Sequence, residues 1–208
     1  LFSSKKKTPI TRTRGGSLQA AVERLEDRVV PSSDLVFDAS SQARVLLQVE
    51  NGQLQIVDQE SHFVLSEQAL ALTSGVRIEG NGSAVNLTID ASVPQLGAGF
   101  VVFDAGDNVN NSLTGPDAQT TWTITGPGSG QLAGFVTFTG VESLIGASQN
   151  DTFTFSSNGS VENLTGGGGS NQIVLDGGTF VNIAFYADHA SDEGSFVRGN
   201  KEQSYTNI

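Results

Sequence analysis

Polar and apolar residues alternate along much of the chain from residue 35 onward, which is the pattern of half-buried β-strands. The clearest example is the pair of segments 45–50 and 53–58, in which apolar residues occupy at least every second position. The dipeptide Asn51-Gly52 separates them, and Asn-Gly is the preferred sequence of the type I′ turn that joins antiparallel strands. The pattern therefore predicts a β-hairpin over 45–58.

Beyond this hairpin the strand signals become shorter, and turns rich in Gly, Asn and Asp separate them. The short runs lie at 76–78, 85–89, 100–103, 121–124 and 135–138. Many short strands at close spacing predict an all-β fold and exclude a helical bundle. The only Trp, Trp122, lies in an alternating run, so we expect it in the core rather than on a sugar-binding surface.

A short repeat of constant spacing runs through the second half of the chain. The segment 141–144, Val-Glu-Ser-Leu, recurs as 161–164 and more weakly as 181–183. A unit of this length cannot bury its own apolar face, whereas stacked units share one core. The repeat predicts a right-handed parallel β-helix or β-solenoid-like body over 35–183. Three residues should stack with their side chains inward: Val141, Val161 and Val181.

The two ends of the chain depart from this pattern. Residues 1–16 are basic and polar, which predicts a disordered leader. The segment 17–32 has apolar residues at the spacing of one helical face, which predicts a short helix. These residues are Leu18, Ala21, Val22 and Leu25. Basic residues return in 184–208 without the repeat, which predicts a poorly ordered tail.

Charge is distributed unevenly along the chain. The net charge is −11, yet most of the Lys and Arg residues lie at or before Arg28, and none lies between Arg77 and Arg198. Such an acidic body repels phosphate, so no nucleic-acid partner is expected. The absence of Cys excludes disulfides and thiolate metal sites. No apolar run approaches the roughly 20 residues that cross a bilayer, so no transmembrane segment is expected either.

The segment 22–32, Val-Glu-Arg-Leu-Glu-Asp-Arg-Val-Val-Pro-Ser, resembles the LEPR-xLL class of N-terminal segments found in large exported proteins of planctomycete bacteria. The residues that match are Leu25, Glu26 and Arg28. Asp27 replaces the usual Pro, and Val30-Pro31 replace the Leu pair. The resemblance implies an export or sorting address that other machinery recognises.

The stretch 113–178 resembles repeats of large bacterial adhesins and hemolysin-type surface proteins. The resemblance rests on 122–126, on the repeated Val-Glu-x-Leu segment, on 151–155 and on the glycine run 166–169. It implies a secreted, elongated β-structure without enzymatic activity. We therefore expect an exported structural or adhesive protein of the cell surface or extracellular matrix, which could be part of a larger repeat protein. Its expected partners are the export machinery and cell-envelope components or polysaccharide.

One motif within the repeat carries a candidate metal site. Residues 146–154 and 166–174 are similar to the nonapeptide G-G-x-G-x-D-x-U-x of calcium-binding β-rolls, in which carbonyl and carboxylate oxygens surround Ca²⁺. Asp151 is the one metal ligand that this similarity indicates. Gln149 and Asn171 replace a glycine and an Asp of the motif. A calcium-dependent binding module therefore stays an alternative, and no other cofactor is expected.

No constellation of residues predicts a catalytic site. The two histidines, His62 and His189, are distant in sequence, and no nucleophile elbow is present. Asp104 with Asp107, or Asp107 with Asp117, is a carboxylate pair that a glycosidase could use, so a carbohydrate-active β-helix enzyme is a further alternative. A cleft lined by three or more carboxylates would favour that enzyme, whereas Asn or apolar ladders along one face would favour the structural protein.

Overall fold

The computed structural model describes residues 32–39, 41, 44–107, 110–177, 183–187, 193–198 and 201–208. The chain divides into two units, 1–30 and 31–208, and the described residues all belong to the second. The predicted leader over 1–16 lies outside the described residues. So does the predicted helix over 17–32, apart from its last residue.

The described unit is all-β, as the sequence predicts. A single 3₁₀ turn, η1 (Leu70–Leu72), interrupts the strands, and the described residues form no α-helix. The strands are β1 (Ser33–Asp38), β2 (Arg44–Glu50), β3 (Gln53–Asp58), β4 (Val64–Ala69), β5 (Thr73–Glu79), β6 (Asn86–Ile89), β7 (Val101–Asp104), β8 (Ser112–Thr114), β9 (Thr121–Gly126), β10 (Ser129–Leu132), β11 (Val136–Thr139), β12 (Ser143–Ile145), β13 (Thr152–Phe155), β14 (Asn163–Thr165), β15 (Gln172–Leu175), β16 (Ile183–Ala187), β17 (Glu193–Arg198) and β18 (Lys201–Thr206).

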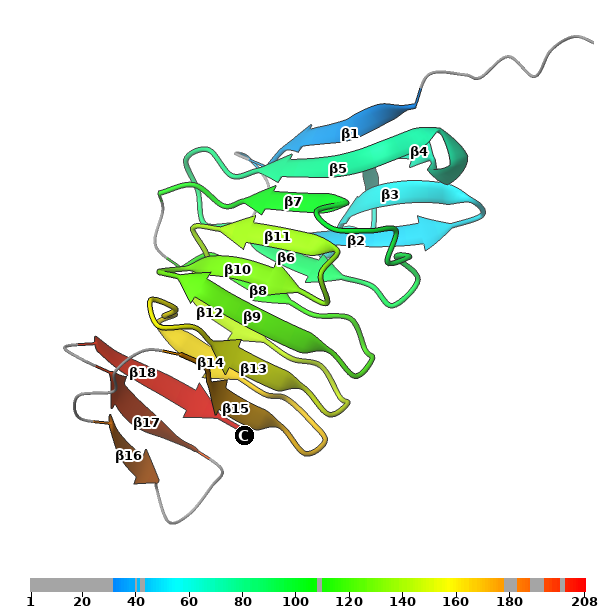
Figure 1. Ribbon diagram of the computed structural model, residues 1–208. Helices are drawn as coiled ribbons and strands as arrows, with labels where there is room; N and C mark the ends of the chain where they lie inside the picture. The colour runs from blue at the N-terminus through cyan, green and yellow to red at the C-terminus, as the bar shows by residue number, and fades with distance from the viewer. Residues whose placement is uncertain are drawn as a thin grey trace, which may run out of the picture. The chain divides into compact units, whose positions relative to one another are not determined.

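The strands form two mixed sheets (Figure 1). The eight-stranded sheet has the order β1-β5-β7-β11-β10-β9-β13-β15, and the ten-stranded sheet has the order β16-β17-β18-β14-β12-β8-β6-β2-β3-β4. From β5 to β15 the chain passes alternately between the two sheets. We call each return of the chain to the same sheet a pass, and strands from successive passes pair in parallel. Among the described strands, antiparallel pairs occur only within three meanders, β2-β3-β4, β9-β10-β11 and β16-β17-β18.

The hairpin predicted around Asn51 is confirmed. Strands β2 and β3 pair antiparallel, with Glu50 opposite Gln53. Asn51 has φ 50° and Gly52 has φ 76°, so both turn residues adopt the left-handed region that a type I′ turn requires. Asn and Gly are the residues that adopt this conformation most readily, which explains why the turn forms here.

The Val-Glu-x-Leu repeat corresponds to the register of paired strands. Leu144 of β12 lies beside Leu164 of β14, and Phe153 of β13 lies beside Ile173 of β15. Val141 and Val161, which precede β12 and β14, are both buried. Equivalent residues of the first two copies therefore lie on neighbouring strands, about 4.8 Å apart.

The third, weaker copy of the repeat does not follow this register. Val181 lies outside the described residues, and Ile183 pairs antiparallel with Arg198 of β17. The strand beside β14 is β18, in which Ser204 lies next to Asn163. The predicted continuation of the stack is therefore wrong at Ile183, because a segment much further along the chain occupies the next position.

The segment 184–208, predicted as a poorly ordered tail, contains most of β16 and all of β17 and β18. Strands β17 and β18 pair along their whole length, and only Gly199-Asn200 separates them in sequence. Phe196 of β17 is buried, and its ring meets that of Phe155 edge-on at 5.5 Å. The segment forms strands because it carries its own short hairpin signal and an aromatic side chain that extends the core.

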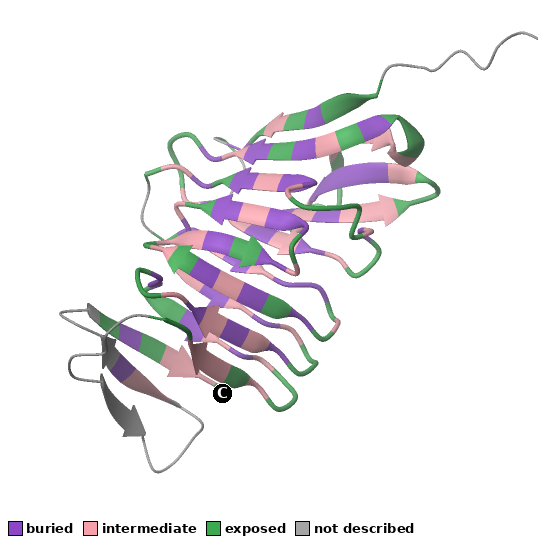
Figure 2. Ribbon diagram, in the orientation of Figure 1, coloured by how far each residue is buried: buried purple, intermediate pink, exposed green. Residues whose placement is uncertain are grey.

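A single apolar cluster joins side chains from both sheets. Trp122 is fully buried within it, stacked on Phe153 with ring centroids 5.6 Å apart and edge-on to Phe138 at 6.3 Å. This confirms the predicted core position of Trp122. Figure 2 shows buried residues alternating with more exposed ones along the strands, as expected when one side of each strand contacts the core.

Candidate functional site

Asp151, the predicted metal ligand, is a buried carboxylate that holds two loops together. The residue is only 1% exposed and lies just before β13. Oδ1 accepts hydrogen bonds from the Thr120 backbone N–H at 2.9 Å and from the Thr120 hydroxyl at 2.5 Å. Oδ2 accepts a hydrogen bond from the Ala147 N–H at 3.2 Å. Both carboxylate oxygens are therefore already engaged by donors of the protein.

These partners differ from those of a calcium cage, which consists of oxygen ligands. The atoms that surround the carboxylate of Asp151 are N–H and O–H donors. Within the part of the chain that the structure describes, no three His, Cys, Asp or Glu residues lie close enough together to hold a metal ion. The geometry at Asp151 is that of a structural clamp between loops.

Asn171, the equivalent of Asp151 in the next repeat, makes the same kind of contact. Its Oδ1 accepts a hydrogen bond from the Asp151 backbone N–H at 2.8 Å. Its Nδ2 donates to the carbonyls of Gly168 at 3.1 Å and Asn207 at 2.8 Å. Hydrogen bonds thus link Thr120, Asp151 and Asn171 in a row, which we call the first ladder.

A second ladder lies at the opposite turns, where the chain enters the ten-stranded sheet. Asn111 Oδ1 accepts from the Val85 N–H at 2.9 Å, and Glu142 Oε2 accepts from the Asn111 N–H at 2.8 Å. Gln203 Oε1 accepts from the Val161 N–H at 2.9 Å. In each case a side-chain oxygen accepts a hydrogen bond from a backbone N–H group of the neighbouring pass. Without this acceptor, the N–H group would be buried without a partner.

The histidines do not form a catalytic set in the described part of the chain. His62 is exposed in the turn after β3, and His189 lies outside the described residues. The turn is organised by Asp58, whose Oδ1 accepts hydrogen bonds from the backbone N–H groups of Ser61 at 2.7 Å and Glu60 at 3.0 Å. The Ser61 N–H is the main reason that the pKa of Asp58 lies below its ordinary value of 3.8.

The structure places one of the two Asp pairs that the sequence suggests for a glycosidase in a common hollow. Asp104 and Asp107 line the same hollow of about 490 Å³. Asp104 Oδ1 there accepts from the Gly106 N–H at 3.2 Å, as expected for a turn. Asp117 instead accepts hydrogen bonds from the backbone N–H and the hydroxyl of Ser148 in another loop.

A groove of about 340 Å³ has three carboxylates in its lining, and no sequence prediction pointed to it. We call it the acidic groove. Its lining residues are Pro127, Gly128, Gly140, Val141, Glu142, Ser160, Val161, Glu162, Glu202 and Gln203. Three of them are Glu, and none of the residues described in this lining is Lys, Arg or His. The sequence signal for it was the repeated Val-Glu pair, which places Glu142 and Glu162 directly before the neighbouring strands β12 and β14.

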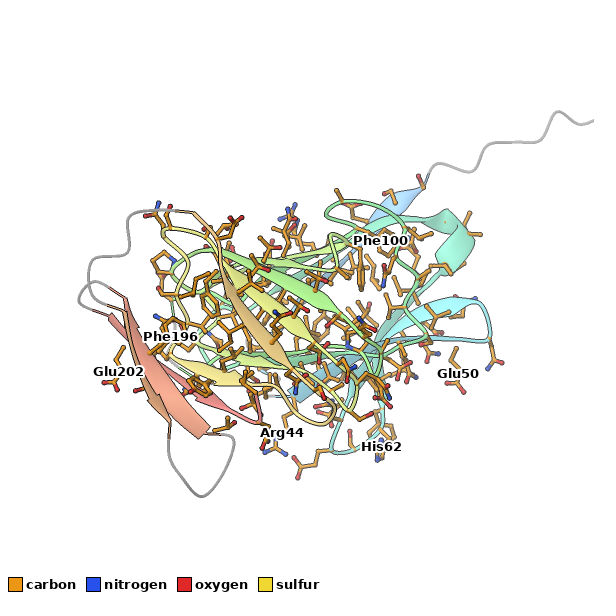
Figure 3. All side chains as sticks on the ribbon, turned by 60° about the horizontal axis from the view of Figure 1, so that its bottom comes forward. Arg44, Glu50, His62, Phe100, Phe196 and Glu202 are labelled. Atoms are coloured by element: carbon orange, nitrogen blue, oxygen red, sulfur yellow. The ribbon has the colours of Figure 1, made fainter. Side chains whose placement is uncertain are left out.

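The three carboxylates of the acidic groove are held differently. Glu142 is fixed by the Asn111 N–H, and Glu202 Oε1 accepts a hydrogen bond from the Ser195 hydroxyl at 2.7 Å. Glu162 is exposed, and its carboxylate makes no hydrogen bond to another described residue. Figure 3 shows Glu202 on the C-terminal strands, far from Glu50 and His62. The arrangement can bind a positively charged or hydroxylated ligand.

Comparisons of this chain with protein-family models, curated proteins and solved structures find no match. No helix in the described part of the chain is long and apolar enough to cross a membrane.

Proposed function

We propose that the described unit is a right-handed β-solenoid and that the protein is an exported structural or adhesive component of a cell surface or extracellular matrix. The observation that carries the proposal is the parallel register of strands from successive passes, which matches the sequence repeat. Ser143 of β12 pairs with Asn163 of β14, and β13 pairs with β15 at the same offset. Parallel crossovers are right-handed in nearly all proteins, which is the reason for the proposed hand.

The use of the polar side chains supports a structural role. The first ladder and the second ladder employ Asp151, Asn171, Asn111 and Gln203 to satisfy backbone groups of neighbouring passes. An enzyme requires some of its polar groups to be free to meet a substrate, whereas these are occupied by the fold. Ladders of this kind suit a protein whose task is to build a stiff, regular body.

The proposed location rests on the segment 22–32, with its resemblance to export addresses. We therefore expect the full chain, carrying a C-terminal tag and produced in a planctomycete host, to become accessible to protease added to intact cells. Leu25→Asp and Arg28→Ala should prevent surface exposure, because they change residues that match the motif. Arg12→Ala removes the same charge outside the motif and should have no effect. Retention of the unaltered protein inside the cell would contradict the proposal.

The acidic groove favours one second candidate, a carbohydrate-active enzyme. Glycosidases act through two carboxyl groups about 5–9.5 Å apart, and carboxylates on adjacent or next-adjacent strands have a comparable spacing. The test is release of reducing ends from a panel of oligosaccharides by the full chain. Activity that Glu162→Gln abolishes would establish the enzyme, whereas intact oligosaccharides after prolonged incubation would exclude it for that panel.

A further inference from the structure

We propose that Asn81 is a site of spontaneous deamidation, at which the backbone nitrogen of Gly82 displaces the side-chain amide of Asn81 as ammonia. The reaction is independent of the proposed function. Asn followed by Gly is especially prone to it, because Gly has no side chain to shield its nitrogen. Three such dipeptides occur in the chain, at 51–52, 81–82 and 158–159, and the fold leaves only the second one ready to react.

The reaction passes through a cyclic imide and needs no reagent other than water. The nitrogen of Gly82 forms a bond to Cγ of Asn81, and the bond from Cγ to Nδ2 breaks. Nδ2 leaves as ammonia and takes with it the proton that the Gly82 nitrogen gives up. Water then opens the imide at either of its carbonyl groups, which leaves an aspartate or an isoaspartate at this position. Each event replaces a neutral amide with a carboxylate and makes the chain more acidic.

Asn81 and Gly82 lie in the loop between β5 and β6, where nothing restrains the bond between them. Both residues are exposed, and neither makes a hydrogen bond to another described residue. Gly82 has φ 122°, and a Cβ added to it would meet no atom within 4 Å. The peptide plane between the two residues can therefore rotate, and the Gly82 nitrogen can reach Cγ of Asn81 without breaking any contact of the fold.

Asn51 is exposed as well, but the hairpin holds it in a conformation that opposes ring closure. Glu50 and Gln53 are paired on either side of the turn. Asn51 and Gly52 both have the positive φ values of a type I′ turn. Ring closure requires the peptide plane between Asn51 and Gly52 to rotate out of this conformation, which would open the two-residue turn and the strand pairing beside it.

Asn158 is exposed, whereas the nitrogen that would attack it is engaged and enclosed. The Gly159 N–H donates a hydrogen bond to the Ser156 carbonyl at 3.0 Å. Gly159 is buried, and a Cβ added to it would collide with the carbonyl oxygen of Ile124. The Gly159 nitrogen can therefore move toward Asn158 only after this loop has come away from its neighbour.

The fold can accept the modified loop, because the loop is anchored on both sides. The Gly80 N–H donates to the Asp104 carbonyl at 2.7 Å, and the Val85 N–H donates to Asn111 Oδ1 at 2.9 Å. An isoaspartate inserts one extra methylene into the backbone. Between these two anchors the exposed residues around Gly82 can absorb it, so β5 and β6 keep their register. The urea midpoint of the modified protein should therefore equal that of the unmodified protein.

The test compares the folded full chain with the same chain unfolded in guanidinium chloride, both at mildly alkaline pH. Mass spectrometry of peptides follows the loss of each amide, and enzymatic methylation detects isoaspartate. The ratio of the unfolded rate to the folded rate should be close to one at Asn81. At Asn51 and Asn158 it should be at least about ten, which corresponds to a barrier higher by about 1.4 kcal/mol. The reason is that contacts of the fold must break there before the ring can close.

The matched control is Asn81→Gln, which keeps an exposed amide but lengthens the side chain, so that the Gly82 nitrogen would have to close a larger ring. This variant should keep its amide at position 81 and leave the rates at Asn51 and Asn158 unchanged. Loss of the amide from Asn51 or Asn158 as fast as from Asn81 in the folded protein would overturn the inference. So would an Asn81 that keeps its amide in the folded protein while the unfolded chain loses it.

Discussion

Asp151→Ala is predicted to lower the free energy of unfolding by about 2–4 kcal/mol. The substitution removes the acceptor of three hydrogen bonds, two from Thr120 and one from Ala147. The Thr120 N–H is the decisive group, because Thr120 is only 4% exposed and its backbone cannot turn toward water. A buried donor left without a partner costs about 1–3 kcal/mol, and the two weaker losses add to this.

The assay is equilibrium unfolding in urea followed by the fluorescence of Trp122, the only Trp, which lies close to Thr120 in the chain. The urea concentration at the unfolding midpoint should fall. The slope of the unfolding free energy against urea concentration should stay constant, because the substitution does not change the surface that unfolding exposes. Asp151→Asn retains one acceptor oxygen and should lose about half as much. Asp117→Ala is the matched control: its hydrogen bonds to Ser148 are exposed, so the loss should stay below about 0.5–1 kcal/mol. Equal losses for Asp151→Ala and Asp117→Ala would refute the clamp.

Three further predictions concern packing, protonation and calcium. Gly115→Ala should cost about 1–3 kcal/mol in urea unfolding, because an added Cβ would lie 2.8 Å from the Trp122 ring; an unchanged midpoint would contradict this. The depressed pKa of Asp58 means that its hydrogen bonds from Ser61 stabilise the fold above the ordinary value of 3.8 and are lost as pH falls through the folded pKa. A pKa of 3.8 or higher for the Asp58 carboxyl in an NMR titration would contradict this prediction. Millimolar Ca²⁺ should raise the melting temperature no more than Mg²⁺ at equal ionic strength, and a Ca²⁺-specific rise lost in Asp151→Ala would instead support the calcium module.

Local signals were sufficient to predict several elements of the fold. Asn51-Gly52 specifies its turn through backbone conformation alone, so the hairpin needed no tertiary information. The constant spacing of the Val-Glu-x-Leu segments predicted the register of β12 with β14, because equivalent positions in a stack must share one core. The size and alternation of Trp122 and its neighbours indicated a core position.

Other features depend on contacts between segments that the repeat does not connect. The pass that contains β9 is longer than the next one, since Thr121 pairs with Thr152, whereas Thr152 pairs with the nearer Gln172. The meander of β9, β10 and β11 accounts for the extra length, and a search for equal spacing misses it. The partner of Asp151, Thr120, lies across this longer pass, so the sequence singled out Asp151 but did not indicate its hydrogen bonds with Thr120.

The acidic groove was also missed, because its third carboxylate comes from the segment expected to be a tail. Glu142 and Glu162 repeat at a visible spacing, but Glu202 joins them only through the pairing of β18 with β14. Nothing in the local sequence of 201–206 specifies that strand as the neighbour of β14.

The central claim, that successive passes stack in parallel register, can be tested most directly by disulfide trapping. The chain contains no Cys, so introduced pairs have no background. Ser143→Cys with Asn163→Cys joins residues that are paired in β12 and β14 and whose side chains already meet at 3.3 Å. Asn163→Cys with Ser204→Cys tests the pairing of β14 with β18.

The control is Ser143→Cys with Thr165→Cys, which combines the same two strands out of register. Disulfides require Cα atoms no more than about 7 Å apart, a limit that in-register neighbours meet and this control exceeds. The account predicts rapid, nearly complete oxidation of both in-register pairs under mild conditions, with little oxidation of the control. Failure of the Ser143–Asn163 pair to close, or closure of the control at the same rate, would contradict the stacked register.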